Sequence, residues 1–172
     1  MKIFFKLLFI LVFNIGFCQQ SSNIFEAARN GEVQVIKNIL KENPEVVNTK
    51  NKEGFSALTL ACYRGNTEVV KLLLKKKADV NISSSMGSPL MAATYKGHLE
   101  IVKLLLSKNV NVDEVDQNGT TSLMFATMFK NIELVKLLIS KKADKTIKDK
   151  SGKTAFEYAT ITGEEMIINL LK

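Results

Sequence analysis

The chain has 172 residues, of which 46% are hydrophobic and 24% are charged, with a net charge of +7. This composition excludes a disordered or fibrous chain, and the length suits a single globular domain. The positive charge comes from lysine, with arginine only at Arg29 and Arg64. Because nucleic-acid readers rely on arginine for base contacts, and no aromatic-basic RNA motif is present, we expect no nucleic-acid partner.

Residues 1–18 have the layout of a secretory signal peptide. Lys2 and Lys6 precede a wholly apolar run over 7–13, and Gly16 and Cys18 supply small residues where a signal peptidase reads the chain. The run is shorter than the ~20 residues that span a bilayer. A membrane anchor and a lipoprotein anchor on Cys18 are the alternatives. We predict cleavage after Cys18, no stable membrane anchor afterwards, and export to the bacterial periplasm or the medium.

The chain then repeats itself with a fixed period. Three segments, TEVVKLLLKKKADVN (67–81), LEIVKLLLSKNVNVD (99–113) and IELVKLLISKKADKT (132–146), align on their apolar runs, with Leu72, Leu104 and Leu137 32 and 33 residues apart. Weaker copies precede and follow them, which gives units at approximately 22–50, 51–83, 84–115, 116–148 and 149–172. A period near 33 residues indicates a solenoid of stacked units.

Within each unit the apolar residues recur at spacings of three and four, which predicts two short amphipathic helices. A hydroxyl residue stands just before each first helix, where it can cap free backbone N–H groups. Glycine follows the first helix in most units and permits a left-handed turn. The links between units are long enough only for a turn or hairpin. The capping residues are Ser56, Ser88, Thr121 and Thr154, and the glycines are Gly65, Gly97 and Gly163.

These units resemble the ankyrin repeat family. The family's Asp-x-x-Gly-x-Thr-Pro-Leu-His-x-Ala-Ala pattern is visible in DQNGTTSLMFAT and DKSGKTAFEYAT, and in SSMGSPLMAAT with one residue missing after Gly87. Its second-helix pattern is matched by VVKLLL and IVKLLL. The resemblance implies an all-α ankyrin-repeat solenoid of about five helix-turn-helix units joined by short hairpin loops, covering residues 19–172, and a non-catalytic module that binds another protein.

The sequence departs from the family pattern at several positions. Thr59, Met91, Met124 and Glu157 replace the histidine whose hydrogen bonds tie adjacent units together in the family. Three other residues, Lys77, Asn109 and Lys142, stand where the family has a glycine after the second helix, and Lys130 replaces an inter-helix glycine. Asparagine tolerates a left-handed backbone well, whereas lysine does so at some cost. We therefore expect a solenoid less stable than an idealised one.

No pattern of catalytic or metal-binding residues is present. His98, the single histidine, shares its register with Asn66 and Asn131, so we expect it to cap the second helix of its unit. Cys62 lies between apolar positions and is expected to be buried. Neither a zinc site nor a nucleophile with its base can be assembled from them. We predict no catalytic residue, no metal and no cofactor; a small enzyme or metal-dependent factor using His98 and Cys62 is the alternative.

What remains is a surface. In ankyrin repeat proteins the hairpin tips and the ends of the first helices form the concave, partner-binding face. Tyrosine, arginine and methionine are enriched at interfaces, so we expect a monomer that binds an apolar and acidic protein target. Alternatives are that some rings pack between units, or that the lysine-rich surface binds acidic surfaces. The candidate binding residues are Lys52, Phe55, Tyr63, Arg64, Tyr95, Lys96, Met128 and Phe129.

Overall fold

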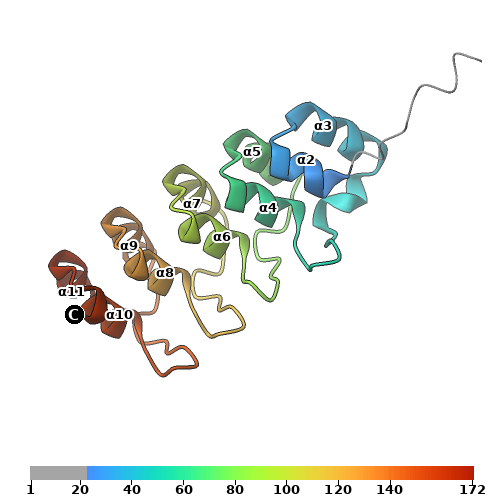
Figure 1. The fold of residues 1–172 in the computed structure, drawn as a ribbon. Coiled ribbons are helices and arrows are strands. Elements are labelled where there is room, and N and C mark those ends of the chain that lie inside the picture. The colour runs from blue at the N-terminus through green and yellow to red at the C-terminus, as the bar shows by residue number, and fades with distance from the viewer. Residues whose placement is uncertain (1–22) are drawn as a thin grey trace, which may run out of the picture.

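The computed structural model describes residues 23–172, and the predicted signal peptide at 1–18 lies outside the described residues. The described chain forms five consecutive helix pairs (Figure 1). They are α2 (Ile24–Asn30) with α3 (Val33–Glu42), α4 (Ala57–Arg64) with α5 (Thr67–Lys75), α6 (Pro89–Tyr95) with α7 (Leu99–Leu106), α8 (Ser122–Met128) with α9 (Ile132–Ser140), and α10 (Ala155–Thr162) with α11 (Glu165–Leu171). A short 3-10 helix, η1 (Pro44–Asn48), follows α3.

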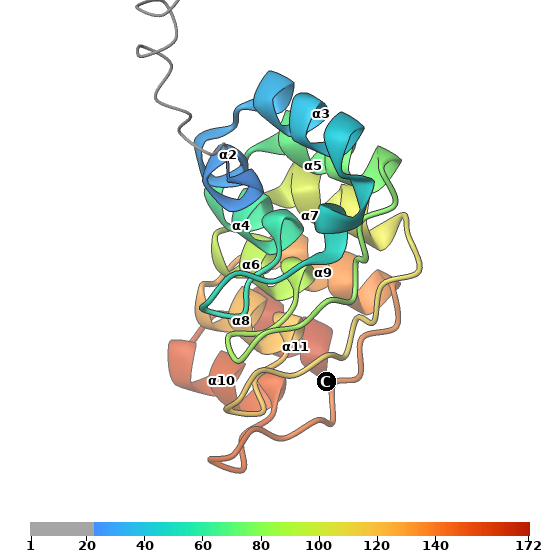
Figure 2. The ribbon, with the colours of Figure 1, turned by 90° about the vertical axis from the view of Figure 1, so that its right-hand side faces the viewer.

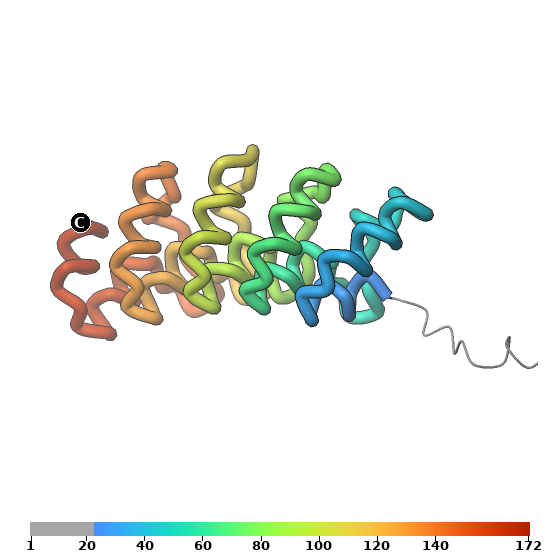
Figure 3. Tube along the Cα trace, turned by 90° about the horizontal axis from the view of Figure 1, so that it is seen from above, coloured from blue at the N-terminus to red at the C-terminus, as the bar shows by residue number. Residues whose placement is uncertain are grey.

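The pairs stack side by side into two layers. The first helices of the units form one layer and the second helices form the other, and the hairpin loops project from the side of the first helices (Figures 1 and 2). Seen from above, the units follow one another in a single row (Figure 3). The all-α solenoid predicted from the 33-residue period is therefore confirmed. No helix within residues 23–172 is long and apolar enough to cross a membrane.

As predicted, the first helices of units two to five begin directly after the hydroxyl residues. Ser56 Oγ accepts a hydrogen bond from Thr59 N at 3.1 Å, and Thr121 Oγ1 accepts one from Met124 N at 3.2 Å. In the last unit the Glu157 carboxylate accepts from Thr154 N at 2.8 Å, which completes a capping box. Each cap satisfies backbone donors that a helix leaves unpaired, so the start of each first helix is fixed locally.

The core runs continuously through the stack because each helix pair buries its apolar face against its neighbours. Leu58, Leu90 and Leu123, equivalent residues of three first helices, are at most 1% exposed. Phe156 holds the same register in the last unit and is 36% exposed, since no described unit packs against its outer side. The outer face of the last unit is thus partly apolar.

The turns after the second helices follow the predicted left-handed conformation at two of three positions. Lys77 and Lys142 have φ values of 62° and 63°, and Lys130 reaches 54° between α8 and α9. Asn109, at the third of these positions, does not have a positive φ. The physical reason is that α7 ends one position earlier in the repeat than α5 and α9 do. The turn that follows α7 contains a hydrogen bond from Val110 N to Lys108 O at 2.8 Å.

Side-chain oxygens link the loops of successive units. Asn48 Oδ1 accepts from Asp79 N at 2.8 Å, Asn81 Oδ1 accepts from Asn111 N at 2.7 Å, and Asp113 Oδ1 accepts from Asp144 N at 2.8 Å. Each bond joins residues about one repeat apart. The loops are therefore fixed to the stack as an ordered row, which gives the hairpins that follow them defined positions.

Aspartates also shape the hairpin tips. Asp116 Oδ1 accepts from Asn118 N and Thr120 N, both at 2.8 Å, and Asp149 makes the equivalent turn in the last unit. The pKa of Asp149 is lowered to about 2, mainly because its carboxylate accepts a hydrogen bond from the Tyr158 hydroxyl. Asp116 is thus engaged within its own hairpin, and Asp149 is held both by its hairpin and by Tyr158 of α10.

Candidate functional site

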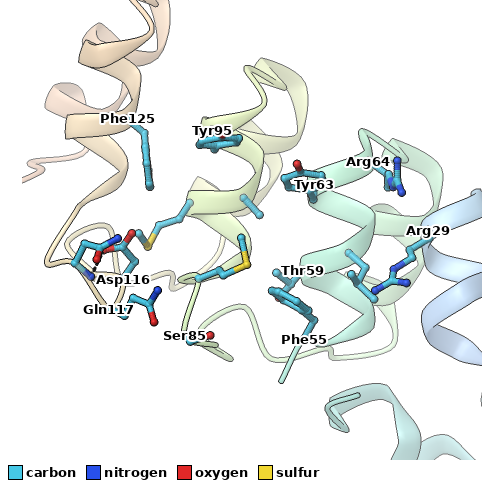
Figure 4. A pocket seen from close by; sticks show the side chains of 15 residues that line it. Arg29, Phe55, Thr59, Tyr63, Arg64, Ser85, Tyr95, Asp116, Gln117 and Phe125 are labelled. Carbon is cyan, nitrogen blue, oxygen red and sulfur yellow. Dashed lines mark hydrogen bonds between the residues drawn. The ribbon is translucent and has the colours of Figure 1, made fainter. Parts of the chain in front are cut away.

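A groove with a volume of ≈390 Å³ lies between the first helices and the hairpins of the central units (Figure 4). It spans the first four units, and its walls are mostly apolar. The lining residues are Arg29, Phe55, Thr59, Leu60, Tyr63, Arg64, Ser85, Met86, Met91, Ala92, Tyr95, Asp116, Gln117, Asn118 and Phe125. A hollow of this size with apolar walls and a few polar groups has the character of a binding site.

Aromatic rings form the helix-side wall of the groove. Tyr63 stacks on Tyr95 with ring centroids 6.3 Å apart, and Phe125 and Phe129 meet Tyr95 edge-on at 5.4 Å and 5.1 Å. Despite these contacts Tyr63, Tyr95 and Phe129 remain 38%, 45% and 53% exposed. The rings therefore pack on one another between units and still present apolar surface to a partner.

Cations flank this aromatic wall. Lys96 Nζ lies 5.2 Å from the centre of the Tyr63 ring, within cation–π range. Arg29 is paired with Glu26 at 3.0 Å and Glu53 at 2.9 Å, whereas within residues 23–172 neither Arg64 nor Lys96 has an ion-pair partner. Because unpaired cations attract carboxylates, the part of the groove beside Arg64 and Lys96 favours an acidic group.

The residues proposed from the sequence are only partly brought together here. Phe55, Tyr63, Arg64 and Tyr95 line the groove. Lys96 and Phe129 adjoin it through their contacts with Tyr63 and Tyr95. Lys52 and Met128 are not among the lining residues.

Sequence reasoning missed several lining residues, above all Phe125 and Met91. Helical spacing could have identified Phe125, because it lies three and four positions before Met128 and Phe129 and so shares their face. Met86, at a hairpin tip, is 63% exposed, whereas Met91 is 1% exposed and shows only its edge to the groove. No sequence pattern distinguishes such a groove-facing methionine from a core one.

The role expected for His98 is wrong in detail. No side-chain bond from His98 or Asn66 caps the helix that follows, whereas Asn131 does accept from Leu134 N at 3.0 Å. His98 Nε2 lies 3.3 Å from Tyr63 O, and Asn66 Nδ2 donates to Ala28 O at 2.8 Å and to Arg29 O at 3.0 Å. These side chains reach back because the first helix of the preceding unit ends opposite them, and its last carbonyl groups have no partner within that helix.

The structure brings together no catalytic or metal-binding cluster from the described residues. Cys62 is fully buried, as expected, and burial raises the pKa of its thiol. No group of three or more His, Cys, Asp or Glu side chains within residues 23–172 is placed to hold a metal ion. His98 lies at the unit-to-unit contact described above.

Comparisons with known proteins agree with this architecture. A family model described as ankyrin repeats (3 copies) matches residues 24–116 and 90–172. The chain is 39% identical to ankyrin repeat and SAM domain-containing protein 6 of Rattus norvegicus over 64 residues, which is 37% of this chain and 7% of that protein. It is 40% identical over 58 residues to alpha-latrocrustotoxin-Lt1a of Latrodectus tredecimguttatus and 39% identical over 62 residues to BCL-6 corepressor-like protein 1 of Homo sapiens, which is 34% and 36% of this chain and 4% of each relative. Each match covers less than a tenth of the relative's own length.

Proposed function

Since the chain belongs to the ankyrin repeat family, whose repeats are protein–protein interaction modules, we propose that it binds a protein partner through the groove and hairpin tips of its concave face. The observation that carries the proposal is the wall of half-exposed rings formed by Tyr63, Tyr95 and Phe129. Aromatic side chains in such positions supply much of the energy of protein interfaces. The proposed module has no catalytic residues of its own.

A comparison of two triple variants tests this proposal. Removing the rings with Tyr63→Ala/Tyr95→Ala/Phe129→Ala should reduce capture of a given partner about tenfold or more, because three rings would be lost from the contact. The matched control is Lys103→Ala/Glu133→Ala/Lys136→Ala, three exposed residues on the second helices. Circular dichroism and thermal unfolding establish that both variants are folded. Equal capture by the wild type and the ring variant contradicts the proposal.

The predicted signal peptide supports a second proposal, that the protein acts outside the cytoplasm, in the periplasm or the medium. Lys2, Lys6 and the apolar run over 7–13 are its basis. Protein recovered from the periplasm or the medium should have the intact mass of a chain that begins at Gln19. A mass that retains residues 1–18 contradicts it.

A further inference from the structure

Beside the groove, the third unit lacks a large side chain that its neighbours have. The first-helix register that lines the groove holds Leu60 in the second unit, Phe125 in the fourth and Tyr158 in the fifth, but Ala92 in the third. Replacing a large side chain by alanine leaves space beside it. Ala92 thus forms the floor of a notch between Leu60 and Phe125.

The hairpin of the third unit enlarges the same notch. Its bridge closes between Ser84 and Gly87, whereas the flanking hairpins close between Lys50 and Ser56 and between Val115 and Thr121. The residue that corresponds to Phe55 in the second unit and Thr120 in the fourth is missing after Gly87. Opposite the helices, the groove is lined by the hairpin residues Phe55, Ser85, Met86, Asp116, Gln117 and Asn118, whereas Met91 lines it from α6 (Figure 4).

Successive hairpins are joined by different contacts along the row. Backbone bonds join the third hairpin to the fourth, from Gln117 N to Ser85 O at 3.2 Å, and the fourth to the fifth, from Lys150 N to Asn118 O at 2.8 Å. Within residues 23–172 no backbone bond joins the tip at 51–54 to the tip at 84–87. These two hairpins are held together by other contacts: Lys50 Nζ donates to Ser83 O at 2.7 Å, and a Cβ atom at Gly54 would lie 3.9 Å from Ser84 Cβ.

The charges at the two ends of the groove differ. Arg29 and Arg64 line the groove toward the first two units, where Arg29 is paired with Glu26 and Glu53. Arg64 has no ion-pair partner among residues 23–172, and Lys96 lies over Tyr63. At the other end, Asp116 and the polar side chains of Gln117 and Asn118 line the wall. A carboxylate on a ligand is attracted toward Arg64 and repelled by Asp116.

We infer that the notch over Ala92 receives a single aromatic side chain of the partner, and that an acidic residue next to it in the partner's sequence pairs with Arg64. Tyr63, Tyr95, Phe125 and Phe55 offer edges and faces to such a ring, and thioethers make favourable contacts with aromatic groups. The partner segment is thus an aromatic residue beside Asp or Glu. This inference rests on the proposed function and specifies the partner's chemistry.

Three acetylated and amidated pentapeptides serve as probes: Gly-Asp-Phe-Asp-Gly, Gly-Asn-Phe-Asn-Gly and Gly-Asp-Ala-Asp-Gly. They are titrated to millimolar concentration into the ¹⁵N-labelled chain. The first should shift the amide resonances of Ala92, Tyr95 and Phe125, the second should bind several-fold more weakly, and the third should cause no shift at the same concentration. Equal shifts from the alanine peptide, or none from the first peptide, overturn the inference.

Two variants separate the notch from the charge. Ala92→Leu places in the notch the side chain that Leu60 has in the same register, and it should weaken the first peptide about tenfold. Arg64→Gln, an exposed change, should remove the difference between the Asp and Asn peptides and leave the Asn peptide unchanged. Lys103→Gln on α7 is the control. Unchanged binding by Ala92→Leu, or a persisting Asp preference in Arg64→Gln, contradicts the inference.

The partner-capture experiment separates this inference from the proposed function. Capture that depends on the three rings but is unchanged in Ala92→Leu overturns the notch and leaves the concave-face function in place. Capture that is indifferent to the rings overturns both. Because Arg64 is exposed, its variant keeps the test decisive even where Ala92→Leu does not fold.

Discussion

At the scale of single residues, the contact between successive first helices depends on side chains that reach back to the preceding unit. His98 Nε2 lies 3.3 Å from Tyr63 O, and the glycine that follows α4, Gly65, makes room for the ring. A Cβ atom at Gly65 would lie 2.7 Å from His98 Cε1. The absence of a side chain at Gly65 therefore allows the His98 ring to pack there, and so influences how the third unit packs against the second.

Gly65→Ala tests this contact, with Gly97→Ala as its matched control. Both glycines have positive φ, 79° and 74°, so each alanine should cost about 1–2 kcal/mol through its left-handed backbone. Only Gly65→Ala also displaces the His98 ring, because a Cβ at Gly97 meets nothing closer than Asn131 at 3.8 Å. It should therefore lose a further ~0.5–1.5 kcal/mol, the contribution of one hydrogen bond, in denaturant unfolding. His98→Ala should abolish the difference; a difference that persists in that background contradicts the assignment.

At the scale of the elements, the turns after the second helices store strain. Lys77 and Lys142 hold left-handed conformations that suit glycine. Each donates its backbone N–H to the carbonyl three residues earlier, Lys77 N to Leu74 O at 3.2 Å and Lys142 N to Ile139 O at 2.8 Å. Asn109 occupies the corresponding sequence position without positive φ. The strain thus belongs to two turns of the three.

Lys77→Gly should stabilise the protein, whereas Asn109→Gly should not. Glycine at Lys77 removes a conformational cost of about 1–2 kcal/mol and adds back about 0.5–1 kcal/mol of chain entropy, so a net gain of roughly 0.5–1 kcal/mol is expected. Glycine at Asn109 adds only the entropic cost. Guanidinium unfolding of both variants measures the difference, and equal changes in stability would argue against strain at Lys77.

These turns also show how far sequence reasoning reaches. The repeat period and the hydroxyl caps predicted the helix pairs and their starts, because both depend on local patterns that the chain repeats. The groove was predicted only in part. Its notch depends on an absence, the small Ala92 beside a shortened hairpin, and its wall depends on Phe125, which contacts Tyr95 of the preceding unit. Asn66 and His98 were misassigned because their partners lie in the preceding unit.

At the scale of the whole molecule, stability should be the sum of the units and their contacts with nearest neighbours. Within residues 23–172 the core is continuous from Ile24 to Leu171, and each unit packs mainly against the units beside it in the row (Figure 1). A central unit has a neighbour on both sides, whereas the last described unit has a neighbour on one side only. Equivalent buried residues should therefore differ in their importance according to their place in the row.

Leu105 and Leu171 hold the same register in the third and fifth units and are 0% and 4% exposed. Leu105→Ala should cost about 2–5 kcal/mol in denaturant unfolding, the range for a large-to-small change in a packed core, because it weakens contacts on both sides of the third unit. Leu171→Ala removes the same atoms from a unit that can open locally while the rest of the stack stays folded. Its effect on the main unfolding transition should be smaller, and hydrogen exchange in α10 and α11 should speed up more than in α6 and α7. A loss under ~1 kcal/mol for Leu105→Ala would contradict the burial of α7, and equal losses for the two variants would mean that the stack unfolds as one cooperative unit.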